Sequence, residues 1–125
     1  VPGTLAIFGA GFREHVLAEA SWLSTKRLLY WGDLDSHGFG ILHRFRSLYP
    51  HTISVLMDAG TFHSFRELAV REPNVYRGDL PLLTPAEREA AAALHEAGGL
   101  RLEQERIPFD HVELVLGTIQ EAEIT

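Results

Sequence analysis

The sequence predicts one α/β domain built on a mainly parallel sheet with helices on both faces. Short apolar runs alternate with amphipathic segments along the 125 residues, and glycine-rich or acidic turns separate them. Strands that alternate with helices pair in parallel, because each helix returns the chain to the end of the sheet at which the previous strand began. The composition agrees, since 46% hydrophobic and 22% charged residues suit a single core.

Three strand–helix units are expected in the N-terminal half. The strands are short and rich in apolar or branched residues, and the helices have apolar residues at spacings of three and four. Pro50 ends the second helix. The predicted strands are 4–8, 27–31 and 52–57, and the predicted helices are 12–23, 39–48 and a short piece around 65–70.

The C-terminal half is expected to open with an ordered surface loop at 72–83, because proline, asparagine and glycine recur there. Thr84, Pro85 and Glu87 form the pattern of a capping box, which predicts a helix to about residue 97. Further predictions are a fourth strand or extended segment at 100–107 and a final helix, capped by Asp110, with the apolar face Val112, Val115, Leu116 and Ile119.

The charge balance argues against a nucleic-acid surface held by this chain alone. Asp and Glu number 17 against 11 Lys and Arg, and the net charge is −6. A role on DNA would need divalent cations at local carboxylates or a basic partner domain. Cysteine is absent, which excludes thiolate metal sites, and no apolar run approaches the roughly 20 residues of a membrane span. We expect a cytoplasmic protein with no membrane contact.

Two carboxylates follow the second predicted strand, at Asp33 and Asp35 of the sequence GDLD. In an extended chain they point to the same side, and such a pair suits Mg²⁺, which commonly uses one or two protein carboxylates. The alternative is an acidic turn that caps the next helix. His37 and Gly38 follow directly and are candidates to lie near a phosphate at the helix start.

The segment RLEQER (101–106) is the second acidic candidate. Strand alternation would place Glu103 and Glu105 on one face, where they could join the aspartates. The alternative is a solvated strand edge with surface ion pairs. Asp58, after the third predicted strand, is interpreted as a residue that stabilises the turn at Gly60.

Other common sites are disfavoured. The Gly9-Ala10-Gly11 turn lacks the third glycine of a dinucleotide loop, and no histidine spacing defines a zinc site. An aspartyl-phosphate phosphatase, with Asp33 as nucleophile and Asp35 as general acid, would need a lysine after the aspartates. The single lysine, Lys26, precedes them.

Several blocks of the sequence occur together in one known family. They are YWGDLDSHGFGILHRFRSLYP, SVLMDAGTF, LPLLTPAE and RLEQERIP. In this order they resemble the C-terminal Toprim domain of JetD, the nuclease subunit of Wadjet anti-plasmid defence systems. That domain is similar in turn to the Toprim domain of type IIB topoisomerase A subunits. The resemblance covers nearly the whole chain.

The resemblance implies a metal-dependent endonuclease that cuts DNA presented by an SMC-like ATPase complex, as a homodimer, in a bacterial or archaeal cell. Asp33 and Asp35 match the Toprim DxD, which holds Mg²⁺ or Mn²⁺. Glu103 and Glu105 match the family's EQE segment, which implies supporting catalytic acids, with Glu105 as the expected further metal ligand. Which of these glutamates points inward stays open.

One departure from the family concerns an upstream glutamate of Toprim nucleases. Glu14 and Glu19 do not match it, because both fall in the first predicted helix. We therefore expect a C-terminal fragment that lacks the first Toprim strand and the basic DNA-binding arm, with little or no nuclease activity alone. The alternative is a catalytically silent Toprim module for dimerisation or partner docking.

Overall fold

The protein is described from a computed structural model, which places residues 4–8 and 27–124. The predicted turn at Gly9-Ala10-Gly11 and the predicted helix 12–23, with Glu14 and Glu19, lie outside the described residues.

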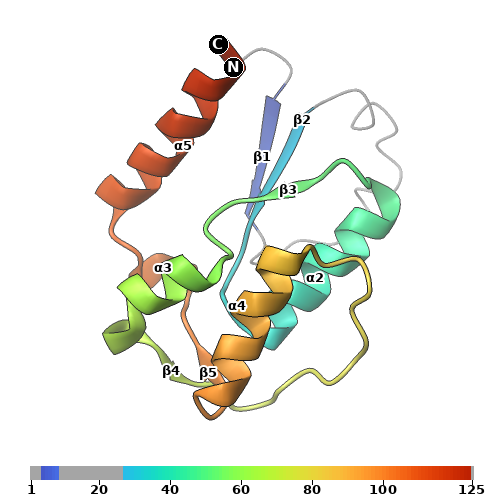
Figure 1. Ribbon diagram of the computed structural model, residues 1–125, viewed down its shortest axis with the longest axis vertical. Helices are drawn as coiled ribbons and strands as arrows, with labels where there is room; N and C mark the ends of the chain where they lie inside the picture. Colours follow the sequence, from blue (N-terminus) through green and yellow to red (C-terminus); the bar gives the residue numbers. More distant parts are fainter. Residues whose placement is uncertain (1–3, 9–26, 125) are drawn as a thin grey trace.

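The described chain forms a parallel three-stranded sheet, a small antiparallel pair of strands and the helices around them (Figure 1). The parallel sheet has the order β1-β2-β3, and the antiparallel pair is β4-β5. The strands are β1 (Thr4–Phe8), β2 (Arg27–Trp31), β3 (Ile53–Ser54), β4 (Val70–Arg71) and β5 (Leu100–Arg101). The helices are α2 (Ser36–Leu48), α3 (Ala59–Ser64), α4 (Pro85–Glu96) and α5 (Phe109–Ile124), with 3₁₀ turns η2 (Arg66–Leu68) and η3 (Gln104–Arg106).

The parallel sheet confirms the predicted α/β class. β1 and β2 have the predicted bounds, and their register pairs Thr4 with Arg27. β3 is shorter than the predicted strand 52–57. Leu56 adopts a φ of 60°, in the left-handed region, so the ladder cannot continue through it. The residues after β3 therefore leave the sheet and enter the core, where Leu56 is buried.

The helix after β3 begins earlier than predicted. The sequence placed a helical piece around 65–70, whereas α3 spans 59–64 and β4 follows soon after η2. Asp58 sets the start of α3, because its Oδ1 accepts the N–H of Thr61 at 2.7 Å. The structural role predicted for Asp58 is thus confirmed, and the predicted range is wrong.

The predicted strand at 100–107 is wrong beyond its first residues. β5 has two residues and runs antiparallel to β4 instead of joining the parallel sheet. The chain then pairs with Leu34 at Leu102 and turns into η3, where the N–H of Arg106 donates to the carbonyl oxygen of Glu103. This turn ends the strand alternation.

The start and end of α4 follow the prediction. Thr84 Oγ1 accepts the N–H of Glu87 at 3.2 Å, and Glu87 Oε1 accepts the N–H of Thr84 at 2.9 Å, which is a complete capping box. Gly98 and Gly99 end the helix with φ values of 101° and 79°.

The final helix starts one residue before its expected cap. α5 begins at Phe109, so Asp110 lies in its first turn, where a negative charge favours the helix N-terminus. The prediction that Asp110 caps the helix is wrong. The predicted apolar face of α5 does pack on the core, through Val112, Val115, Leu116 and Ile119.

Among the placed residues, no helix is long and apolar enough to span a membrane.

A buried ion pair joins α2 to α4, which lie side by side in Figure 1. The guanidinium of Arg46 donates to both oxygens of Glu87, at 2.5 and 2.9 Å, and to the carbonyl oxygen of Thr52. Burial alone would raise the pKa of Glu87, but hydrogen bonds from Arg46 and Ser54 outweigh it and hold that pKa below its ordinary value. Glu87 is therefore charged and structural.

Candidate acidic site

The two aspartates of GDLD lie where the chain leaves β2 and enters α2. Asp35 is the N-cap of α2, and its Oδ1 accepts the N–H of Gly38 at 2.6 Å. The helix-capping alternative is therefore confirmed for Asp35. Capping occupies one carboxylate oxygen, so this role is compatible with a metal-ligand role for the other.

A backbone bridge connects this turn to the segment after β5. The N–H of Leu34 donates to the carbonyl oxygen of Leu102 at 2.9 Å, and the reverse bond measures 3.0 Å. Both leucines are buried, at 1% and 0% exposure. The residues that flank these two leucines interact with one another, because Glu103 forms an ion pair with Arg101 and the charges of Asp33 and Asp35 both act on Arg101. We call this set the charged face; its members are Asp33, Asp35, Arg101 and Glu103.

Arg101 is the positive member of the charged face. Its NH2 group lies 3.2 Å from Glu103 Oε1, and both side chains are about 30% exposed. The hydrogen bond to Glu103 raises the pKa of Arg101, and the aspartate charges raise it further. Arg101 thus balances part of the negative charge around the aspartates.

Backbone N–H groups orient both aspartates. Asp33 Oδ1 accepts the N–H of Gln104 at 2.8 Å, as Asp35 Oδ1 accepts that of Gly38. Within the described part of the chain, the second oxygen of each carboxylate accepts no hydrogen bond. Two oriented carboxylates with an open oxygen each are a donor set that fits Mg²⁺ or Mn²⁺.

The Asp35 carboxylate is unfavourable in its charged form. The residue is only 5% exposed, and this burial raises the pKa of Asp35. The hydrogen bond from Gly38 acts in the opposite direction, while the charges of Glu72 and Asp33 raise the pKa further. A cation at the open oxygen would offset this cost.

Residues 33–35 form what we call the acid turn, and Gly38 packs too closely against it to carry a side chain. A Cβ there would lie 2.0 Å from the carbonyl oxygen of Asp33 and 3.2 Å from Asp35 Oδ1. Its own carbonyl oxygen accepts the hydroxyl of Tyr30 at 3.0 Å. The close packing therefore explains why a glycine occupies position 38. That Gly38 lies near a bound phosphate stays a prediction.

Two of the predicted site residues are exposed. His37 is exposed, and its Nε2 is hydrogen-bonded to the carbonyl oxygen of Asn74. Glu105 is exposed in η3, so the expectation that it shares a strand face with Glu103 is wrong, because the chain turns at Gln104. Among the residues placed, no three His, Asp or Glu side chains form a group that could hold a metal. The role of Glu105 as a ligand stays a prediction.

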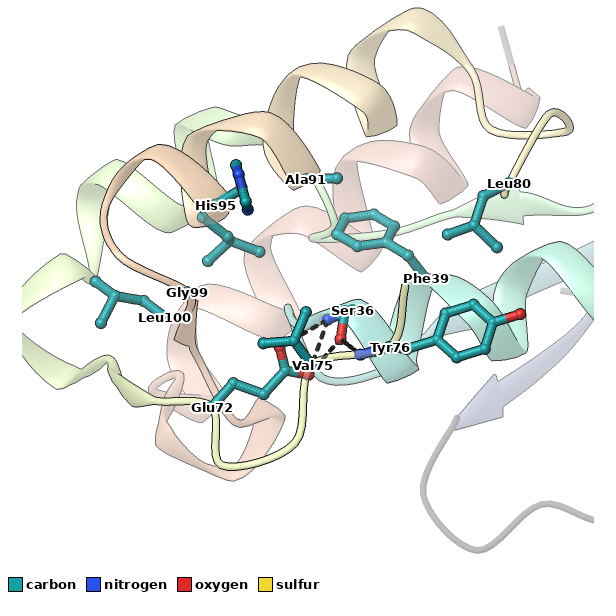
Figure 2. A pocket seen from close by; sticks show the side chains of 11 residues that line it. Ser36, Phe39, Glu72, Val75, Tyr76, Leu80, Ala91, His95, Gly99 and Leu100 are labelled. Atoms are coloured by element: carbon teal, nitrogen blue, oxygen red, sulfur yellow. Dashed lines mark hydrogen bonds between the residues drawn. The ribbon is translucent and has the colours of Figure 1, made fainter. Parts of the chain in front are cut away.

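Sequence reasoning missed Glu72. It was placed at the start of a surface loop, yet it is 6% exposed and lies at the N-terminus of α2. Its Oε1 accepts the N–H of Ser36 at 3.1 Å and the Ser36 hydroxyl at 2.6 Å (Figure 2). The pairing of β4 with β5 brings Glu72 there, so no local spacing could have indicated it.

An apolar cavity of about 170 Å³ adjoins this contact, with Ser36 and Glu72 at its polar side (Figure 2). Phe39 and Leu94 are among its apolar lining residues. Neither aspartate of the charged face lines it. The cavity is thus separate from the candidate metal ligands.

Comparison with known proteins identifies one family. A family model described as the C-terminal part of the Wadjet protein JetD matches residues 1–116. The match includes the charged face and Glu72, and it ends within α5. Among curated proteins, no sequence matches the chain.

Proposed function

Because the chain belongs to the family of JetD C-terminal domains, we propose that it is the metal-binding, Toprim-type domain of a DNA endonuclease. The reaction is hydrolysis of a phosphodiester bond in plasmid DNA, with Mg²⁺ or Mn²⁺ as cofactor. The observation that carries this proposal is the pair Asp33 and Asp35, each fixed by a backbone N–H and each with an open oxygen.

The acidic residues of the charged face have proposed roles. Asp33 and Asp35 hold the cation, and Gln104 and Gly38 keep their carboxylates in position through backbone N–H groups. Glu103 is the further carboxylate that shares their face. When bound, the cation supplies an activated water and neutralises charge that develops on the phosphate.

The acidity of the chain shapes the proposed partners. A net charge of −6 repels the DNA backbone, so cations at the aspartates and basic surfaces elsewhere must provide the phosphate contacts. We propose that an SMC-like ATPase complex presents the DNA. A homodimer would deliver one acidic site to each strand.

The first test replaces each aspartate by asparagine in the full-length protein. Asparagine keeps the shape and the capping ability of Asp35 but weakens cation binding. We expect Asp33→Asn and Asp35→Asn to lower Mn²⁺-dependent plasmid cleavage by about 100-fold or more, since even residues that only support metal ligands cost about 10–100-fold. Cleavage is measured on supercoiled plasmid, and Mn²⁺ binding by calorimetry.

Asp58→Asn is the matched control. Asp58 caps α3 as Asp35 caps α2, but it is exposed and not on the charged face. We expect this variant to cut normally. Normal cutting by both Asp33→Asn and Asp35→Asn would refute the site assignment. A parent protein that neither binds Mn²⁺ nor cuts would favour the silent module for dimerisation or docking.

A further inference from the structure

We propose that Glu72 is a positioning residue for Asp35 and increases the affinity of the charged face for a divalent cation; this inference rests on the proposed function. Glu72 is outside both acidic sequence motifs and directly follows β4.

Glu72 closes the N-terminus of α2 from outside the helix. Its Oε1 accepts the N–H and the hydroxyl of Ser36, at 3.1 and 2.6 Å, and its Oε2 lies 3.4 Å from the same nitrogen. The N–H of the first helical residue has no partner inside a helix. Glu72 supplies that partner for Ser36, while Asp35 supplies the one for Gly38. The backbone directly after Asp35 is thus fixed by two carboxylates.

The backbone of Glu72 is itself held in place. Its N–H donates to the carbonyl oxygen of Gly99 at 2.8 Å, which extends the pairing of β4 with β5. The same unit continues to Leu102, which bridges to Leu34. The β4-β5 unit therefore holds the turn around Asp35 at two places. Leu102 is hydrogen-bonded to Leu34, which precedes Asp35, and Glu72 is hydrogen-bonded to Ser36, which follows it.

The loop after Glu72 adds a further contact to Ser36. The N–H of Tyr76 donates to Ser36 Oγ at 2.6 Å, while the Ser36 hydroxyl donates to Glu72 (Figure 2). The Ser36 hydroxyl is thus engaged both as donor and as acceptor. This arrangement fixes the Glu72 carboxylate against Ser36, so Glu72 acts through Ser36 and through its charge.

The negative charge of Glu72 also acts on the site at Asp35. Both residues are buried, and Glu72 is hydrogen-bonded to Ser36, the residue directly after Asp35, so its negative charge lies near that of Asp35 and away from solvent. A field that disfavours a lone negative charge favours a nearby cation. Removing the charge of Glu72 should therefore weaken cation binding at Asp35 even where the hydrogen bonds survive.

The test compares Glu72→Gln with the parent protein. Glutamine retains a carbonyl oxygen for Ser36 but has no charge. We expect the Mn²⁺ concentration that gives half-maximal cleavage to rise by about 10-fold, with a smaller change in the rate at saturating Mn²⁺. Glu72→Ala should lower that saturated rate as well, because Ser36 then loses its acceptor. Mn²⁺ calorimetry gives a second readout.

Glu89→Gln is the matched control, because it removes the same charge from an exposed position on the α4 surface that faces α3. We expect it to match the parent protein in both measurements. Parent-like Mn²⁺ dependence of Glu72→Gln, in a protein that binds Mn²⁺ and cuts, would overturn the role of Glu72 alone. Absence of Mn²⁺ binding and cutting in the parent would overturn the proposed function and this inference together.

Discussion

Gly38 is the residue at which the acid turn tolerates the least change. A Cβ would lie 2.0 Å from the carbonyl oxygen of Asp33, a backbone atom that cannot rotate away. We expect Gly38→Ala to lower the free energy of unfolding by about 1–3 kcal/mol, the range for a forced overpacking. Urea unfolding followed by circular dichroism measures this change.

Gly117→Ala provides the control for that substitution. Gly117 lies in α5, and a Cβ there would meet no atom of the residues that the structure describes within 4 Å. Alanine should therefore stabilise the helix by about 0.5–1 kcal/mol. Unfolding midpoints that coincide for Gly38→Ala and the parent protein would show that the turn can relax around the new methyl group.

The residues of the site were predictable to the extent that their signal is local. Asp33 and Asp35 follow a strand and are separated by one residue, so the spacing alone indicated them. Glu72 contacts Ser36 across 36 positions of sequence, and only strand pairing creates that contact. Arg101 reaches the aspartates through the bridge at Leu102 in the same way.

The buried ion pair of Arg46 with Glu87 links α2 to α4. Glu87→Gln would leave the buried guanidinium of Arg46 without its counter-charge. We expect the free energy of unfolding at pH 7 to fall by about 3–5 kcal/mol. The exposed neighbour substitution Glu89→Gln should change it by less than about 0.5 kcal/mol.

The pH dependence tests the same pair. The pKa of Glu87 is lower in the folded protein than its ordinary value of 4.5, so its stabilising effect is present above that value. The effect is lost as the pH falls through the folded pKa. The stability difference between the parent and Glu87→Gln should therefore shrink as the pH falls below 4.5. An unchanged difference between pH 7 and pH 3 would contradict this role.

Whole elements were predictable where their boundaries carry local signals. β1 and β2 are continuous apolar runs, and α4 has a capping box and a terminal glycine pair, so these bounds were close. β3 and the 100–107 segment failed for a different reason. The left-handed Leu56 and the bond from Gln104 to Asp33 depend on the assembled fold and not on hydrophobic alternation.

At the scale of the whole molecule, the charged face places a cost on folding. The β4-β5 unit, the end of β2 and the start of α2 converge there, and Asp35 is buried at their junction. Burial and the neighbouring carboxylates raise the pKa of Asp35. The folded protein therefore holds the Asp35 proton more tightly than the unfolded chain does, so this group's contribution to stability falls as the pH rises through that pKa. The raised pKa of Asp35 therefore weakens the fold at pH 7 relative to a carboxyl with its ordinary pKa.

This cost predicts opposite effects of one substitution on stability and on metal response. Without metal, Asp35→Asn should unfold at a higher temperature than the parent at pH 7, because it keeps the cap and removes the buried charge. Mn²⁺ at 100 times its Kd should stabilise the parent by about 2.7 kcal/mol and leave Asp35→Asn nearly unchanged. Thermal unfolding with and without Mn²⁺ measures both effects. If Mn²⁺ does not change the unfolding temperature of the parent protein, the open oxygens of the charged face do not bind the cation. The role of Asp35 would then be limited to capping α2.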